Sequence, residues 1–95
     1  MIVAAAIEYK GLIFTKPRPN RHHDIIHQLD DYVDDYFQWG KVEQGFIDHM
    51  GVFYTREAAY QHCQLIGQPL VRRLALIEAG RNVYNGEELF SEDLW

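Results

Sequence analysis

The sequence predicts an α+β fold, in which a small antiparallel sheet of two hairpins carries two or three helices packed on one face. Three observations support this prediction: short apolar runs joined by turn residues, longer stretches with helical periodicity, and the resulting order β-β-α-β-β-α-α. A chain of 95 residues is expected to form one domain, residues 1–95. A domain of this size buries roughly 60–65% of its extended surface.

The first hairpin is predicted from the N-terminal apolar run. Residues Ile2–Ile7 are continuously apolar and too short for a free-standing helix, so they indicate a strand that is buried on both faces. Lys10 and Gly11 supply a turn, and residues 12–15 form the return strand. The two prolines that follow cannot continue a strand ladder, so the chain leaves the sheet there.

The first helix is expected to run from an N-cap at Asn20 to about Phe37. At 100° per residue, its apolar side chains share one broad arc that should lie on the sheet. His22 falls inside that arc, whereas His23 and His27 fall outside it, beside aspartates. The apolar members of the arc are Ile25, Ile26, Leu29, Tyr32, Val33, Tyr36 and Phe37.

The second half of the sheet is predicted after a loop at residues 38–42. Residues 44–48 and 52–54 form a second hairpin around a turn at residues 49–51. Thr55 is a good N-cap for the next helix, which Gly67 should end. The side chains expected to face inward from this helix are Ala58, Ala59, His62, Leu65 and Ile66.

A third helix is expected to open at Pro69 and to stop at Gly80, with an apolar stripe formed by Leu70, Leu74 and Ile77. The dipeptide at residues 85–86 is a turn signal, and an acidic and aromatic tail follows it.

Composition narrows the function classes. The net charge of −5 argues against general nucleic-acid binding, because binding to a phosphate backbone requires a basic surface. Cys63 is the single cysteine, so no internal disulfide can form and a reducing cytoplasm is the expected setting. No apolar run approaches membrane-spanning length, so we expect no membrane association. Thirteen aromatic residues, five Phe, six Tyr and two Trp, can fill a small core or provide stacking surfaces.

The segment from Arg18 to Asp24 is the principal candidate site. The first turn of a helix offers free backbone N–H groups and the positive end of the helix dipole, which together favour an anion. Arg18 and Arg21 can add bidentate hydrogen bonds to phosphate or carboxylate. Burial and the dipole both favour neutral His22. The alternative, equally open at this point, is that Asn20 caps the helix and that the arginines and histidines are solvated.

Two further segments are candidates for the same site. In Gln44-Gly45-Phe46, the glycine permits close approach of a ligand or backbone, and the amide offers both a donor and an acceptor; an ordinary β-bulge explains the same residues. His23 and His27 have the i, i+4 spacing of a helical metal pair, and a third ligand would have to come from Asp24, Asp30 or the tail. A solvated helix face explains the same residues, so we expect no metal and no cofactor.

The C-terminal tail completes the candidate set. Its apolar residues are costly to leave in water, so we expect the tail to dock on the body of the domain. Ser91 can then cap a last turn, and Glu92 and Asp93 can pair with Arg18, Arg21 or Arg81. Arginines paired in this way are not available to an outside anion. The candidate ligand-binding residues are Arg18, Arg21, His22, His23, Asp24, Gln44, Gly45, Phe46, Ser91 and Trp95.

Four motifs in order carry a resemblance that covers nearly the whole chain: residues 21–24 (RHHD), residues 44–46 (QGF), the helix from residue 56 to residue 68, and residues 91–95 (SEDLW). In these the chain resembles a family of small, functionally uncharacterised proteins from tailed bacteriophages and prophages. The resemblance implies a phage-encoded protein that acts in the bacterial cytoplasm, and it brings no catalytic residues.

Three functions are compatible with these observations. The first is a non-enzymatic phage accessory protein that binds a small anionic or nucleotide-like ligand, for example to sequester a bacterial defence signal. The second is an acidic protein-interaction module that inhibits a host protein. The third is a small hydrolase that uses His22 or His23 as acid and base, with Asp24 or Asp93 orienting the histidine. A homodimer is compatible with all three.

Overall fold

The computed structural model describes residues 1–30, 38–80 and 87–95. Over these residues the chain forms an α+β fold with a four-stranded antiparallel sheet in the order β2-β1-β3-β4 and three α-helices. The predicted fold class and element order are therefore confirmed. The predicted turn at residues 85–86 lies outside the described residues.

The first hairpin forms as predicted. Strands β1 (Ile2–Tyr9) and β2 (Leu12–Thr15) pair in the register Ile7↔Phe14. Lys10 and Gly11 between them have φ angles of 48° and 82°, the positive values that a tight two-residue hairpin turn requires. Because β1 lies between β2 and β3, its apolar run is buried almost completely.

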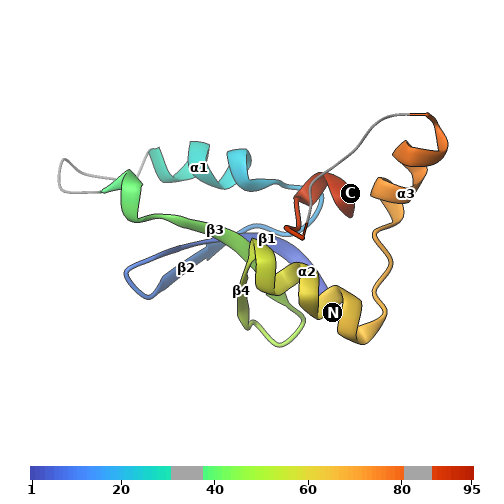
Figure 1. The fold of residues 1–95 in the computed structure, drawn as a ribbon. Helices are drawn as coiled ribbons and strands as arrows, with labels where there is room; N and C mark the ends of the chain where they lie inside the picture. Colours follow the sequence, from blue (N-terminus) through green and yellow to red (C-terminus); the bar gives the residue numbers. More distant parts are fainter. Residues whose placement is uncertain (31–37, 81–86) are drawn as a thin grey trace.

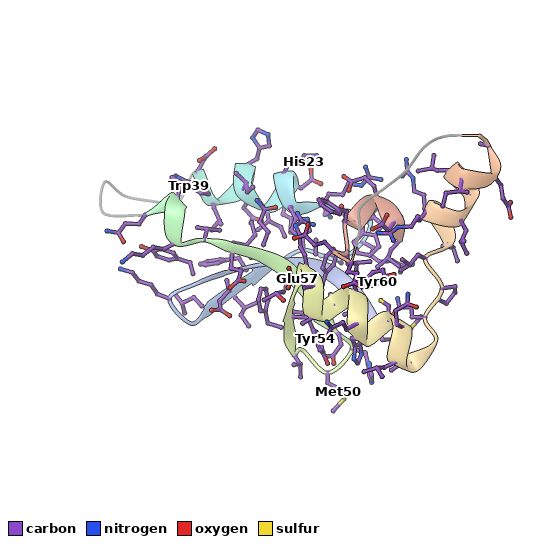
Figure 2. All side chains as sticks on the ribbon, in the orientation of Figure 1. His23, Trp39, Met50, Tyr54, Glu57 and Tyr60 are labelled. Carbon is purple, nitrogen blue, oxygen red and sulfur yellow. The ribbon has the colours of Figure 1, made fainter. Side chains whose placement is uncertain are left out.

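The second hairpin consists of β3 (Glu43–Asp48) and β4 (Phe53–Thr55). Strand β3 pairs with β1 so that Phe46 lies opposite Ala5. The loop expected before it contains one short 3₁₀ turn, η1 (Trp39–Lys41). Met50, in the turn between the two strands, projects away from the sheet (Figure 2).

The core lies between one face of the sheet and two helices, α1 (His22–Asp30) and α2 (Arg56–Ile66). Figure 1 shows α3 (Val71–Glu78) beyond the end of the sheet, and the C-terminal 3₁₀ turn η2 (Ser91–Asp93) between α1 and α3. Tail docking is thus confirmed. The buried core residues are Ile2, Ala5, Ile7, Ile25, Leu29, Phe46, Ala59, Cys63, Leu70, Leu89 and Leu94.

The predicted start of the first helix is wrong by one residue, because an N-cap at Asn20 implies a first helical residue at position 21. The helix begins at His22, and the Asn20 side chain donates to the Pro17 carbonyl 2.8 Å away. The Asp24 carboxylate instead accepts from the Arg21 backbone N–H at 2.7 Å, because an acid in the first turn competes for the same free donors. Residues 31–37, predicted as the end of this helix, lie outside the described residues.

The two ends of α2 are as predicted, but its inward side is only partly so, because Ala59 is buried whereas two other expected residues are not. The Thr55 hydroxyl accepts from the Ala58 backbone N–H, and Gly67 ends the helix at a φ of 71°. The expected inward residues Leu65 and Ile66 are exposed. The buried side of the helix is centred on Ala59 and Cys63, which at 100° per residue leaves Leu65 about 140° away. At the end of the helix the neighbouring strand is covered by Gln68, which bonds both backbone groups of Ile2.

Candidate functional site

The three segments predicted to form one site do come together. The start of α1, the middle of β3 and the C-terminal tail meet, and the first turn of α2 joins them. Phe46 lies at the centre, with its ring edge-to-face against His22 at a centroid distance of 5.0 Å and against Trp95 at 6.4 Å.

His22 holds α1 on the sheet. Its Nε2 lies 2.7 Å from the Gly45 carbonyl oxygen, which can only accept, so Nε2 carries the proton. Its Nδ1 is then an acceptor, 3.5 Å from Nη2 of Arg56. Burial lowers the pKa of His22 to about 4, with help from the Arg56 charge and against the effect of the Gly45 hydrogen bond. His22 is therefore neutral at pH 7, as the sequence predicts.

Arg56 is the residue at this site that sequence reasoning missed. Its guanidinium donates to Gln44 Oε1 at 2.7 Å and to the Leu89 carbonyl oxygen at 2.9 Å. It also lies 4.3 Å from the ring centroid of Phe90. One side chain thus joins α2, β3 and the tail. Its position in the sequence could have indicated this role. The helix dipole disfavours a cation in the first turn of a helix, so an arginine there suggests a partner elsewhere in the fold.

The two arginines of the connector contact the tail. Arg21 donates to the main-chain oxygen of Trp95 and lies 3.8 Å from the Glu92 carboxylate. The Arg18 guanidinium lies 5.1 Å from the Trp95 ring centroid. The indole N–H donates in turn to the Asn20 carbonyl oxygen at 3.1 Å. At Arg21 the tail therefore occupies the guanidinium, as the predicted pairing of the acidic tail with an arginine requires.

Asp93 has a different partner from those predicted. Its two carboxylate oxygens accept from Nε and Nη2 of Arg73 at 2.9 and 2.8 Å, and Phe90 N–H donates to it at 2.9 Å. This bidentate pair is the main polar link between α3 and the tail, and the hydrogen bonds from Arg73 to Asp93 raise the pKa of Arg73. Of the expected partners, Arg81 lies outside the described residues.

The remaining predicted site residues divide into exposed and buried ones. His23 points outward from α1 (Figure 2) and lies 3.4 Å from the Asp24 carboxylate. The hydrogen bond from the Arg21 backbone lowers the pKa of Asp24. Ser91 is the first residue of η2, and it is buried. Within residues 1–30, 38–80 and 87–95, no three His, Cys, Asp or Glu side chains are grouped as a metal site requires.

Two surface depressions lie near these residues. One, of about 320 Å³, is lined by Gln44, Thr55, Arg56 and three glutamates: Glu43, Glu57 and Glu88. Three carboxylates around one guanidinium do not favour an anion. The other, of about 390 Å³, runs between β2 and α1 and is mainly apolar. Neither is lined by Arg18, Arg21 or His22.

Comparison with protein families identifies the chain's relatives. The family model described as "Phage T4 y16D protein" matches residues 1–95. The chain belongs to this phage protein family. Comparison with curated proteins and with solved structures gives no match. In the described part of the chain, no helix combines the length and the apolar character needed to cross a membrane.

The hydrogen bonds at the meeting point hold separate segments of this chain together. Four of the polar residues that the sequence singled out there form hydrogen bonds within the same chain: Arg21, His22, Asp24 and Gln44. The Gly45 position is also sterically closed, because a Cβ there would lie 2.0 Å from the Tyr54 carbonyl oxygen. The cluster therefore fastens four segments together, and the open surfaces lie beside it.

Proposed function

We propose that this phage protein is an interaction module that binds an extended segment of a partner protein along β2. The observation that carries the proposal is the apolar groove of about 390 Å³ between that edge strand and α1. Its apolar lining comes from Ile13, Phe14, Ile25 and Leu29.

An edge strand beside a groove is suited to strand addition. Strand β2 ends the sheet order β2-β1-β3-β4, so in the described part of the chain no strand lies along one side of its backbone. A partner strand gains main-chain hydrogen bonds along that side, and its alternate side chains can enter the groove. The side chains of Leu12 and Ile13 on β2 are 62% and 43% exposed, and covering them favours association.

The charge of this protein indicates which residues should flank the partner segment that binds along β2. The protein has a net charge of −5, and the helix beside the groove carries Asp24 and Asp30 outside its buried side. A segment with apolar residues at alternate positions and basic flanking residues is the complementary ligand. Inhibition of a host protein by occupation of such a segment is the use that agrees with phage origin and action in the host cell.

A peptide selected from a random library on the wild-type protein tests this proposal. Isothermal titration should give an affinity that falls by about tenfold or more in Leu12→Lys and in Ile13→Lys. Met50→Lys is the matched control, since Met50 is 75% exposed on the opposite hairpin. Selected peptides that bind all three variants as tightly as the wild type would refute binding at β2.

A second candidate is the binding of a small anionic or nucleotide-like ligand, such as a bacterial defence signal, at Arg18. The favouring observation is that the exposed Arg18 guanidinium lies against the Trp95 ring, which offers charge and a stacking surface together. Titration with a panel of nucleotides and cyclic oligonucleotides tests it. Binding that Arg18→Ala removes would support it, and no heat with any member of the panel would dismiss it.

A further inference from the structure

Two glutamates lie side by side on the face of the sheet that points away from the core. Successive residues of a strand point to opposite faces, and Ile7 of β1 and Phe46 of β3 are buried in the core. The side chain of Glu8 therefore lies on the other face. Glu43 of β3 pairs directly with Glu8, so its side chain lies on that face as well.

The pairing of these two glutamates is unfavourable in the free protein. Like charges directly opposite each other in neighbouring antiparallel strands are destabilising. Within residues 1–30, 38–80 and 87–95, neither carboxylate forms an ion pair. Glu43 is exposed and Glu8 is half-buried. A positively charged group supplied by a partner is therefore electrostatically favoured beside them.

The register of the first hairpin connects this acidic pair to the open edge of the sheet. Ile13 of β2 pairs directly with Glu8. The side chains of Ile13, Glu8 and Glu43 thus form one row across β2, β1 and β3. Ile13, at the edge end of the row, is 43% exposed, so a strand added along β2 would extend this row by one residue.

The backbone of Ile13 also points towards that edge. A two-residue turn is closed by a hydrogen bond between the residues that flank it, so Tyr9 and Leu12 form a bonded pair. Bonded and non-bonded pairs alternate along an antiparallel ladder, which makes Ile13 and Glu8 a non-bonded pair. The N–H and C=O groups of Ile13 are therefore directed away from β1, towards an incoming strand.

We propose that the segment bound along β2 carries a lysine or an arginine beside Ile13, between two apolar residues that enter the groove. This inference rests on the proposed function, and it specifies the sequence pattern of the partner. The side chains of an added strand alternate between the two faces in either strand direction. A residue beside Phe14 lies on the side of the groove, so its neighbour lies on the side of the glutamates.

The distance across the row suits a long basic side chain. Two strand spacings, about 10 Å, separate the backbone of the added strand from that of Glu8. The apolar stem of a lysine or arginine can cover Ile13 while its charged end meets the Glu8 carboxylate. An apolar or acidic residue at this position would leave both glutamates without a cation, so the row discriminates between partner segments by charge.

Peptides selected from a random library on the wild-type protein test this pattern. Those that Leu12→Lys weakens should contain a lysine or arginine between two apolar residues. Isothermal titration with such a peptide should give an affinity about three- to fivefold lower for Glu8→Gln, the effect of one exposed ion pair. Glu78→Gln removes the same charge from the exposed end of α3. It is the matched control and should leave the affinity unchanged.

The outcomes separate this inference from the proposed function. Peptides that Leu12→Lys weakens, but that lack the basic residue or bind Glu8→Gln as tightly as the wild type, would overturn the charge pattern and leave binding at β2 standing. Peptides that neither Leu12→Lys nor Ile13→Lys weakens would overturn both.

A charge reversal distinguishes ion pairing from an altered fold. A peptide with glutamate in place of its basic residue should bind Glu8→Lys more tightly than it binds the wild type. Free Glu8→Gln should also unfold at a temperature about 1–4 °C higher than the wild type, because the like-charge pair is removed. If the glutamate peptide shows no preference for Glu8→Lys, and the circular dichroism spectrum of that variant is retained, the proposed pairing is wrong.

Discussion

The contact between α3 and the tail rests on a buried ion pair, and removing its cation gives a sharp test of the packing. The Asp93 carboxylate is fully buried, and the Arg73 side chain is only 13% exposed. Arg73→Met keeps most of the side-chain volume but removes the guanidinium that compensates the carboxylate. The variant must then either bury the Asp93 carboxylate without the Arg73 guanidinium or release the tail.

The cost follows from the burial of the pair. Breaking a buried pair by removing one partner typically costs about 3–5 kcal/mol. Because the Phe90 N–H still donates to Asp93, we expect a value near the lower limit, about 3 kcal/mol. For a domain of this length that corresponds to a fall in Tm of roughly 12–24 °C.

Urea unfolding followed by circular dichroism measures this difference. Arg72→Met, one residue away on the exposed side of the helix, is the control and should change the free energy of unfolding by less than about 0.5 kcal/mol. The double variant Arg73→Met/Asp93→Asn should recover part of the loss, because the side chain then carries no charge to compensate. A loss below about 1 kcal/mol in Arg73→Met, or a double variant no more stable than the single one, would refute the reasoning.

Three further predictions concern the meeting point of α1, β3 and the tail. The pKa of His22 is about 4 when folded and 6.5 when free, so between these values the unfolded chain holds more protons. The free energy of unfolding should therefore rise with pH across that window, by up to roughly 3 kcal/mol. Urea titrations at several pH values should show this rise in the wild type and a flatter profile in His22→Gln. Gly45→Ala should lower the free energy of unfolding by more than about 2 kcal/mol, because the added Cβ would lie 2.0 Å from the Tyr54 carbonyl oxygen. Gly40→Ala is the control: the space around Gly40 is open, so its midpoint of thermal unfolding should fall only a little. Trp95→Ala should cost about 2 kcal/mol, less than for a fully buried tryptophan, and a thermal midpoint equal to that of the wild type would contradict docking of the tail in solution.

Local patterns in the sequence determined the framework. A short apolar run, a two-residue turn and a return strand predicted the first hairpin, and Thr55 and Gly67 fixed both ends of α2. The periodicity of α1 placed His22 on the side of the helix that faces the sheet, where it is buried. Each of these predictions depends on residues within a few positions of each other, where backbone sterics and periodicity are sufficient.

The tertiary structure alone decided which polar groups pair. Arg56 bonds to Leu89, 33 residues away, and Arg73 to Asp93, 20 residues away. A sequence shows that a tail rich in acids needs cations, but several arginines satisfy that need equally well. Which of them lies within hydrogen-bond distance depends on the packing of α2 and α3, and that packing is set by the whole core. The physical reason is that burial is summed over the whole fold, whereas turns and caps are local.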